Sequence, residues 1–294
     1  IPVGQLGIIA LPGCEELANK IDNYLIRWRF QRNSEHKDTL AFAGYEKSTY
    51  LINMDFPRFG TGEGKAALNQ TVRGYDIYIL CDVFNYGVTY KMYGITVPMS
   101  PDEHFANLKR AISAIEGKAK RVSVIMPMLY EGRQHKRSSR ESLDCAMMLQ
   151  ELHNMGVENF ITFDAHDPRV MNAIPLCGFE SISPAYQMIK AAVNNVDNLK
   201  INKDNIMIIS PDEGGMSRCI YYSTVLGVEL GMFYKRRDFS RIVDGRNPII
   251  AHEFLGDNVE GKDVIIVDDM ISSGESMIEV ATKLKELKAA RIYI

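Results

Sequence analysis

The stretch that most constrains the fold of this chain lies near its end, at residues 264–276. It begins with four consecutive β-branched residues, 264–267. An uninterrupted run of this kind is typical of a strand buried on both faces of a parallel sheet. Two carboxylates follow, Asp268 and Asp269, and then a hydroxyl-rich turn and an amphipathic segment over residues 277–288. This order predicts a ligand site at the carboxyl end of a strand, where open α/β sheets bind their ligands.

The turn and the acidic pair together indicate which ligand fits. Backbone N–H groups at the start of a helix, with the helix dipole behind them, can hold a phosphate. The carboxylates can accept hydrogen bonds from sugar hydroxyls, so the stretch predicts a site for a phosphorylated sugar. The alternative is that the acidic pair only caps the following helix. The turn itself consists of Ser272, Ser273, Gly274, Glu275 and Ser276.

Composition excludes several classes of protein. The 294 residues suffice for two domains, and the charged fraction of 24% is that of an ordinary globular protein. A formal net charge of -3 gives no basic field, so we expect no nucleic-acid partner. No apolar run has the length of a membrane span, so no membrane association is expected. Five dispersed cysteines favour neither a disulfide framework nor a zinc site, and they fit a reducing cytoplasm.

Strand patterns alternate with helical patterns along the chain, which predicts an α/β protein with two doubly wound parallel sheets. We place the domain boundary near Ser183 and Pro184, giving domains 1–183 and 184–294. The chain lacks an initiator Met and stops within an apolar segment, so we expect the second domain to be truncated. Strands are predicted at 7–10, 50–54, 77–81, 122–126, 160–163, 205–210, 229–233 and 264–267, and helices at 15–28, 101–115, 139–154, 215–226 and 277–288. Residues 32–47 are predicted to be irregular, and residues 84–99 favour no element.

Two further strands end in polar loops that contain potential metal ligands. His166 follows the strand at 160–163, and Asp212 follows the strand at 205–210. One imidazole and one carboxylate, completed by phosphate oxygens and water, suit Mg²⁺. The alternatives are a hydrogen-bonded core histidine for His166 and a helix cap for Asp212.

Two loops carry a concentration of positive charge. Residues 132–140 hold four cations before a predicted helix, where the dipole already favours anions, so they indicate either a polyanion site or a solvated face. Residues 235–238 read Lys-Arg-Arg-Asp, and with residues 239–253 they indicate a cationic lid that neutralises a transferring phosphoryl group. The alternative for the second loop is a surface charge run. A third loop, residues 58–63, reads in isolation as a hairpin turn whose Phe59 packs locally.

Seven stretches in the same order resemble the ribose-phosphate pyrophosphokinase family, which has the type I phosphoribosyltransferase fold. They are RFGTGE, VRGYDIYIL, GRQHKRSSR, DAHD, SPDEGG, KRRD and VDDMISSGES, and they span nearly the whole chain. The resemblance implies two phosphoribosyltransferase-like domains. It also implies transfer of the diphosphoryl group of ATP to the 1-hydroxyl of ribose 5-phosphate, giving 5-phosphoribosyl 1-pyrophosphate and AMP for nucleotide biosynthesis.

The resemblance also implies a role for each site residue and a homo-oligomer built from dimers, such as a hexamer. Phe59 stacks on adenine and Glu63 bonds its edge, both reaching the site from a neighbouring subunit. Arg133 and Gln134 contact the nucleotide, and Lys235 and Arg237 stabilise the transferring group. The remaining roles are Mg²⁺ binding by His166 and Asp212, and ribose 5-phosphate binding by Asp268, Asp269, Ser272, Ser273, Gly274, Glu275 and Ser276.

Four positions depart from the family pattern. Thr61 replaces an acid that reads adenine, and His135 replaces the acid after Arg-Gln. Ser272 stands where the family has a third acid, and Glu275 stands where it has glycine. Residues 27–54 and 84–99 are longer than the usual connections. A non-catalytic homologue that regulates an active synthetase remains an alternative. A phosphoribosyltransferase is a weaker one, because it needs only the last of the seven stretches.

Overall fold

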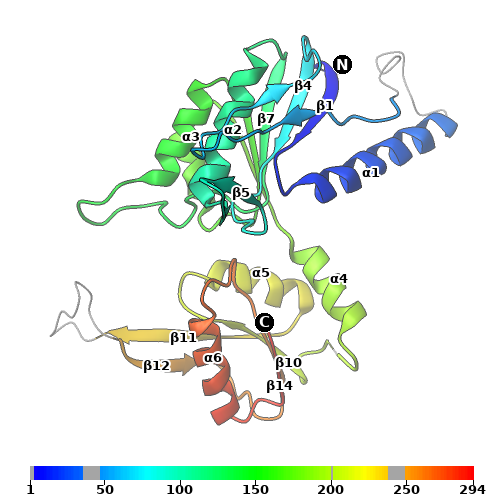
Figure 1. The fold of residues 1–294 in the computed structure, drawn as a ribbon. Helices are drawn as coiled ribbons and strands as arrows, with labels where there is room; N and C mark the ends of the chain where they lie inside the picture. Colours follow the sequence, from blue (N-terminus) through cyan, green and yellow to red (C-terminus); the bar gives the residue numbers. More distant parts are fainter. Residues whose placement is uncertain (1–2, 36–46, 200, 238–248) are drawn as a thin grey trace. The chain divides into compact units, whose positions relative to one another are not determined.

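The computed structural model describes residues 3–35, 47–199, 201–237 and 249–294. Its contacts divide the chain into two compact units, Ile1–Ser183 and Pro184–Ile294 (Figure 1). Each unit is built around a five-stranded sheet. No helix within the described ranges combines the length and the apolar character that crossing a membrane requires.

The sheet of the first unit is entirely parallel, with strand order β1-β4-β7-β8-β9. The strands nearest its centre are apolar runs, and Ile77, Ile79 and Val124 have no exposed surface. Burial on both faces follows from helices that cover both sides, as the sequence predicted. The strands are β1 (Gln5–Ala10), β4 (Tyr75–Leu80), β7 (Arg121–Met126), β8 (Asn159–Phe163) and β9 (Gly178–Ile182).

Helices lie on both faces of this sheet (Figure 1). Helix α1 (Glu15–Ser34) covers one face, where Cys14 and Ala18 pack with Ile8 and Leu80. Helices α2 (Pro101–Ile115) and α3 (Asp144–Asn154) cover the other. Helix α2 starts sharply because Ser100 and Glu103 form a capping box around it. A 3₁₀ helix, η2 (Pro168–Ala173), follows β8.

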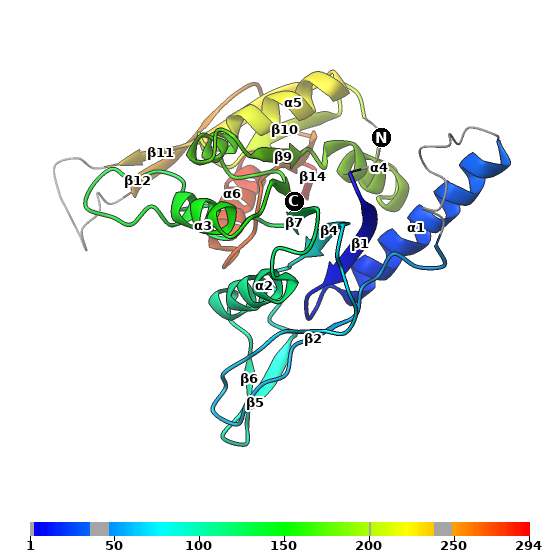
Figure 2. The same ribbon diagram turned by 90° about the horizontal axis from the view of Figure 1, so that it is seen from above.

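Two short antiparallel pairs extend the first unit beyond its sheet. One joins β2 (Met54–Asp55) to β3 (Ala67–Leu68), and residues 56–66 form the turn between them. The other is a hairpin of β5 (Thr89–Met92) and β6 (Ile95–Pro98), which projects away from the sheet in Figure 2. This hairpin, residues 89–98, occupies most of the segment 84–99 that the sequence pattern left unassigned.

The second unit has strand order β12-β11-β10-β13-β14. The central strand β10 (Ile206–Ser210) is buried along its whole length, and β13 (Asp263–Ile266) runs parallel beside it. Helix α6 (Glu275–Glu286) packs on one face, and α4 (Ala185–Asn195) and α5 (Met216–Leu226) pack on the other. The outer strands are β11 (Glu229–Arg237), β12 (Ile249–Leu255) and β14 (Arg291–Tyr293).

The predicted α/β class with two parallel-sheet units is confirmed, with one addition. Strand β12 pairs antiparallel with β11 at the border of the second sheet. Several predicted bounds were wrong. Helix α1 continues six residues beyond the predicted end at 28, and α3 begins at Asp144 instead of 139. Residues 50–54 contribute only one isolated bridge, Ile8 to Leu51, and the start of β2.

Candidate active site

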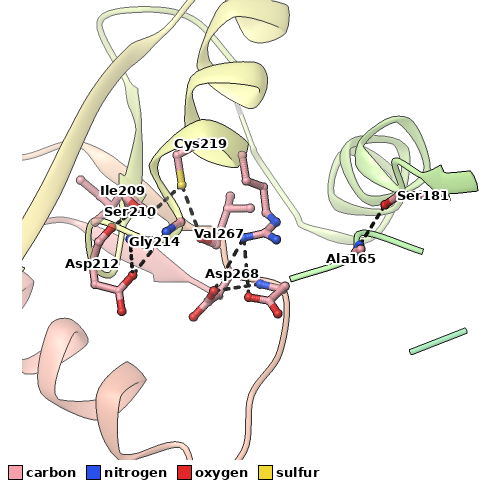
Figure 3. A network of polar contacts seen from close by, with 12 residues as sticks. Ala165, Ser181, Ile209, Ser210, Asp212, Gly214, Cys219, Val267 and Asp268 are labelled. Atoms are coloured by element: carbon pink, nitrogen blue, oxygen red, sulfur yellow. Dashed lines mark hydrogen bonds and ion pairs between the residues drawn. The ribbon is translucent and has the colours of Figure 1, made fainter. Parts of the chain in front are cut away.

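Three carboxylates gather at the carboxyl ends of β10 and β13. These strands are direct parallel neighbours, with Ile209 opposite Ile266, so the loops that follow them leave the sheet at the same edge. Asp212 lies in the first loop, and Asp268 and Asp269 lie in the second; Figure 3 shows Asp212 and Asp268 beside each other. We call these three residues the acidic edge. The sequence analysis assigned Asp268 and Asp269 to a sugar and Asp212 to a metal as separate sites, and the geometry brings the three carboxylates together.

Arg218 supplies positive charge to the acidic edge. Its Nη1 lies 3.9 Å from Oδ1 of Asp268 and 3.7 Å from Oδ1 of Asp269. The Arg218 side chain is only 13% exposed, so water screens these attractions less than it would at the surface. The sequence analysis missed this residue. Its signal was a cation in the first turn of α5, where the helix dipole disfavours positive charge unless nearby acids compensate it.

The surroundings of Asp268 at the acidic edge disfavour its charged form. Burial, then the neighbouring Asp269, then Asp212 raise the pKa of Asp268 to about 6. The Asp268 Oδ1 also accepts a hydrogen bond of 2.9 Å from the Asp269 backbone N–H, which favours the charged form. A group poised near neutral pH by several converging causes is typical of functional sites.

Asp212 holds the loop that leads into α5. Its Oδ1 accepts hydrogen bonds from the backbone N–H groups of Gly214 at 3.0 Å and Gly215 at 3.3 Å. The Ser210 hydroxyl donates to the Asp212 carbonyl at 2.7 Å. A side chain on Gly215 would meet Ser210 Oγ at 2.9 Å, so the loop depends on that glycine. Both N–H groups precede the first residue of α5, and its N-cap residue Gly215 has no side-chain cap hydrogen bond. Asp212 therefore holds the loop in front of the helix instead of capping the helix, and these bonds fix where its carboxylate lies.

The hydroxyl-rich turn leads directly into α6. Gly274 has φ of 81°, a conformation that glycine adopts without strain, and α6 starts at the next residue. The helix begins two residues earlier than predicted, so Glu275 lies in its first turn, where the dipole favours a negative charge. Ser272, Ser273 and Ser276 are exposed. These side chains are therefore accessible to a ligand, and the Ser273 hydroxyl accepts a hydrogen bond of 3.4 Å from the Glu275 N–H at the helix start.

Residues 132–140 of the first unit, which we call the basic loop, are held together by Gln134. Its Nε2 donates to the Ser142 carbonyl at 2.7 Å, and its backbone N–H donates to the Glu131 carbonyl at 2.9 Å. Arg133 beside it is exposed. Because α3 begins only at Asp144, the cations of this loop do not stand at a helix start, and the predicted conflict with the helix dipole was wrong.

His166 lies beside the basic loop. It is exposed, which rules out the core-histidine alternative. The rings of His135 and His166 are tilted, with centroids 5.2 Å apart. Nε2 of His135 lies 3.5 Å from Oδ2 of Asp167, and Asp167 is also held by Arg169. The hydrogen bonds from Arg169 keep the pKa of Asp167 well below its usual range, so this carboxylate stays charged.

Phe59 and Glu63 lie in the turn between β2 and β3. The turn closes on itself, because the Phe59 N–H donates to the Glu63 carbonyl at 2.8 Å and the Gly62 N–H donates to the Phe59 carbonyl at 2.9 Å. The Thr61 hydroxyl donates to a Glu63 carboxylate oxygen at 2.9 Å. Phe59 is 56% exposed as a residue, so it is not buried by local packing as the interpretation of the turn in isolation expected. We call residues 58–63 the base turn.

Lys235 and Arg237 lie in strand β11, which extends four residues beyond the predicted end at 233. Lys235 pairs with His252 of β12, and Arg237 pairs with Ile249. Residues 249–253 of the predicted lid are therefore strand. The rest of the proposed lid, residues 238–248, lies outside the described residues.

No group of three or more His, Cys, Asp or Glu side chains in the described parts of the chain is arranged to hold a metal ion. His166 belongs to the first unit and Asp212 to the second. The proposed Mg²⁺ ligands are thus one side chain from each unit.

Comparisons with known proteins agree on one family. A family model described as the N-terminal domain of ribose phosphate pyrophosphokinase matches residues 6–156, and a phosphoribosyl transferase domain model matches residues 179–294. The ribose-phosphate pyrophosphokinase of Ralstonia nicotianae is 29% identical over 241 residues, covering 80% of this chain and 67% of that protein. That of Vibrio parahaemolyticus is 28% identical, covering 80% and 68%. A crystal structure of phosphoribosylpyrophosphate synthetase from Mycobacterium smegmatis shares the fold, with a TM-score of 0.72, 19% identity, and coverage of 98% of this chain and 79% of that one.

Proposed function

Because the chain belongs to the ribose-phosphate pyrophosphokinase family, we propose that it transfers the diphosphoryl group of ATP to the 1-hydroxyl of ribose 5-phosphate. The products are 5-phosphoribosyl 1-pyrophosphate and AMP. The acidic edge followed by an open, hydroxyl-rich helix start is the observation that carries this proposal. It offers acceptors for sugar hydroxyls beside donors for a phosphate.

We assign the binding of ribose 5-phosphate to the second unit. Asp268 and Asp269 accept hydrogen bonds from the ribose hydroxyls, and Arg218 holds both carboxylates ready. The 5-phosphate binds at the start of α6, where Ser272, Ser273 and Ser276 are exposed and Gly274 lets the backbone turn. Glu275 belongs to the helix start itself, where its charge supports the helix.

We assign the binding of ATP mainly to the first unit. The exposed ring of Phe59 suits stacking on a base, and the Glu63 carboxylate can accept from an exocyclic amine. Arg133 is exposed and can pair with a phosphate, while Gln134 fixes the loop that presents it.

The chemistry is an in-line displacement at the β-phosphorus of ATP. A bond forms between the sugar 1-oxygen and the β-phosphorus, the bond from that phosphorus to the α,β-bridging oxygen breaks, and AMP leaves with the bridging oxygen. The hydroxyl proton passes to solvent. Catalysis of such a transfer is mostly positioning and charge neutralisation, and we assign Lys235 and Arg237 to the second task.

Mg²⁺ prefers oxygen ligands, and Asp212 of the acidic edge offers carboxylate oxygens. Among the described residues the three carboxylates of the edge do not by themselves form a metal-binding group, so an ion there would depend on further ligands. We propose Asp212 and His166 as its protein ligands, with phosphate oxygens and water completing the shell. The ion would neutralise the phosphate oxygens of bound ATP.

We also propose that the protein works as a homo-oligomer built from dimers, with the base turn serving a neighbouring subunit. Sedimentation velocity tests the assembly directly, and a protein that stays monomeric at enzyme-assay concentrations would contradict it.

The free cysteines, most of them buried, fit a reducing cytoplasm.

The proposed reaction is tested by AMP release from purified protein with ATP, Mg²⁺ and ribose 5-phosphate. AMP should form only when all three are present, in an amount equal to the phosphoribosyl pyrophosphate produced. A reaction without the sugar controls for hydrolysis, and parallel reactions with GTP and CTP define the preferred nucleotide. The non-catalytic alternative predicts no AMP with any of the three nucleotides from protein that still binds ribose 5-phosphate.

A further inference from the structure

The β5–β6 hairpin has a conformationally costly tip. Its two-residue loop, Tyr93 and Gly94, has φ of 49° and 81°, the positive values of a type I′ turn. Such positions favour Asn and Gly, and a bulky aromatic residue there is unusual. Strain of this kind persists only where surrounding contacts hold it, and it concentrates at functional sites. The contacts that hold the tip lead to the base turn.

The hairpin touches the base turn through its backbone and its side chains. The Tyr93 N–H donates to the Gly60 carbonyl at 2.8 Å. Gly62 has φ of 94°, and a side chain there would meet the Met92 sulfur at 3.0 Å. The positive φ already favours glycine at position 62, and a larger residue would also require Met92 of the hairpin to shift.

A second link runs through Arg58, the first residue of the base turn. Its guanidinium lies over the ring of Tyr90, 4.5 Å from the centroid, and its Nη1 donates to the Gly62 carbonyl at 2.9 Å. The Tyr90 hydroxyl donates to Glu103 of α2, and Arg58 Nη1 lies 3.8 Å from the same carboxylate. The Arg58 side chain is only 9% exposed. Hairpin, turn and helix α2 are thus joined in one closed set of contacts.

Nothing in this arrangement uses the Phe59 ring itself. The backbone of the turn is held by its own hydrogen bonds, by Arg58 and by the hairpin, yet Phe59 at its centre remains 56% exposed as a residue. The exposed part of this side chain contributes no apolar burial to the fold. Holding the ring in place lowers the entropy lost when a flat ligand stacks on it.

We propose that the β5–β6 hairpin is a positioning element for the nucleotide base, and that it fixes the base turn through Tyr90, Met92 and the backbone of Tyr93. The inference rests on the proposed role of Phe59 and Glu63 in binding the base. It adds a part of the chain that the sequence assigned to no function. The hairpin sets the affinity for the nucleotide and leaves the affinity for the sugar phosphate unchanged.

Two substitutions at Tyr90 separate its contributions. Tyr90→Phe removes the hydroxyl bond to Glu103 and keeps the ring over Arg58, whereas Tyr90→Ala removes both. We expect the dissociation constant of a non-hydrolysable ATP analogue, measured by calorimetry, to rise about threefold for the first and about tenfold for the second. The KM for ribose 5-phosphate should not change. Ile95→Ala is the matched control, because Ile95 lies on the same hairpin, is 68% exposed and has no contact with the base turn among those described above.

A deletion tests the hairpin as a whole. Thr89 pairs with Pro98, so replacing residues 90–97 by Asn-Gly closes the chain across neighbouring strand positions. The shortened protein should weaken nucleotide binding at least as much as Tyr90→Ala. Thermal unfolding of each variant monitors the fold, and sedimentation velocity monitors assembly.

The outcomes are distinct. Weakened nucleotide binding at unchanged ribose 5-phosphate KM supports the proposal. A lower melting temperature with wild-type nucleotide affinity overturns it, because the hairpin would then only stabilise the fold. Nucleotide affinity that returns at high protein concentration also overturns it, because the hairpin would then act through assembly. Absence of AMP release from the wild type would instead contradict the proposed reaction, and the calorimetric comparison does not depend on turnover.

Discussion

The acidic edge of the second unit and the base turn of the first are built in opposite ways. The acidic edge stands on two buried parallel strands, and its carboxylates are partly buried, crowded and held by Arg218. The base turn stands on two strands of two residues each, and its aromatic ring is exposed. One site obtains its rigidity from the sheet, and the other obtains it from side-chain contacts with a hairpin and a helix.

The difference matches the ligands that we assign to the two sites. A ribose phosphate is recognised by hydrogen bonds and charge, which need donors and acceptors fixed within fractions of an ångström in a partly dry site. A base is recognised mainly by stacking on a flat face, which tolerates an exposed surface. We therefore expect substitutions at the acidic edge to change sugar parameters strongly and substitutions at the base turn to change nucleotide parameters modestly.

We expect the largest effect on kcat from Lys235→Ala. This substitution tests whether the second unit supplies positive charge to the diphosphoryl group during transfer. We expect kcat to fall about a thousandfold, because one cation that pairs with the transition state is lost. The KM for ribose 5-phosphate and the melting temperature should change little. Single-turnover measurements of AMP release provide the rate. If kcat survives the change, the transition-state charge is neutralised from elsewhere and Lys235 has no catalytic role.

Arg218→Gln addresses the acidic edge itself. Without the guanidinium, Asp268 and Asp269 repel each other with less compensation, and the pKa of Asp268 should rise further. We expect kcat/KM for ribose 5-phosphate to fall about thirtyfold, with Arg218→Lys recovering part of the loss because it keeps the charge. The nucleotide KM should stay near the wild-type value. A parallel loss in both substrates would mean that Arg218 supports the whole unit and not the sugar side.

The sequence predicted the two sites to very different extents. The acidic edge could be predicted because a β-branched run marks a buried strand, and the polar residue after such a run must lie at the sheet edge. Arg218 was not found, because a single cation in a helix shows its partner only once α5 is placed against β13. The base turn could be named only by resemblance, since the contacts of Tyr90 and Arg58 join segments about 30 residues apart that share no periodic pattern. The start of α3 was placed too early because the loop before it has the composition of a helix start without its cap.

The raised pKa of Asp268 makes a prediction about stability. Its carboxyl has a pKa of about 6 in the folded protein against an ordinary value of 3.8, so the folded state binds the proton more tightly than the unfolded chain. Its contribution therefore favours folding below about pH 4, and that contribution is lost as the pH rises through about 6. We expect Asp268→Asn, which cannot ionise, to gain about 2 kcal/mol relative to wild type between pH 4.5 and 7.5.

Urea denaturation in metal-free buffer across that range measures the difference. Asp269 and Asp212 oppose the Asp268 charge and Arg218 favours it, so the same series on Arg218→Gln should show a steeper dependence. A difference between Asp268→Asn and wild type that stays constant with pH would show that Asp268 is ionised throughout the range.

The smallest effect is expected from Thr61→Ala in the base turn. The Thr61 hydroxyl donates to a Glu63 oxygen at 2.9 Å, so it occupies part of the carboxylate that we expect to read the base. Removing the hydroxyl frees that oxygen, and we expect the KM for ATP to fall about twofold while the KM for GTP, which offers no amine at that position, stays unchanged. Thr61→Ser is the control, because it keeps the hydroxyl. The ratio of kcat/KM for ATP and GTP is the measurement. If that ratio falls in Thr61→Ala, the hydroxyl itself contacts adenine, and base selection depends on two side chains of the turn instead of Glu63 alone.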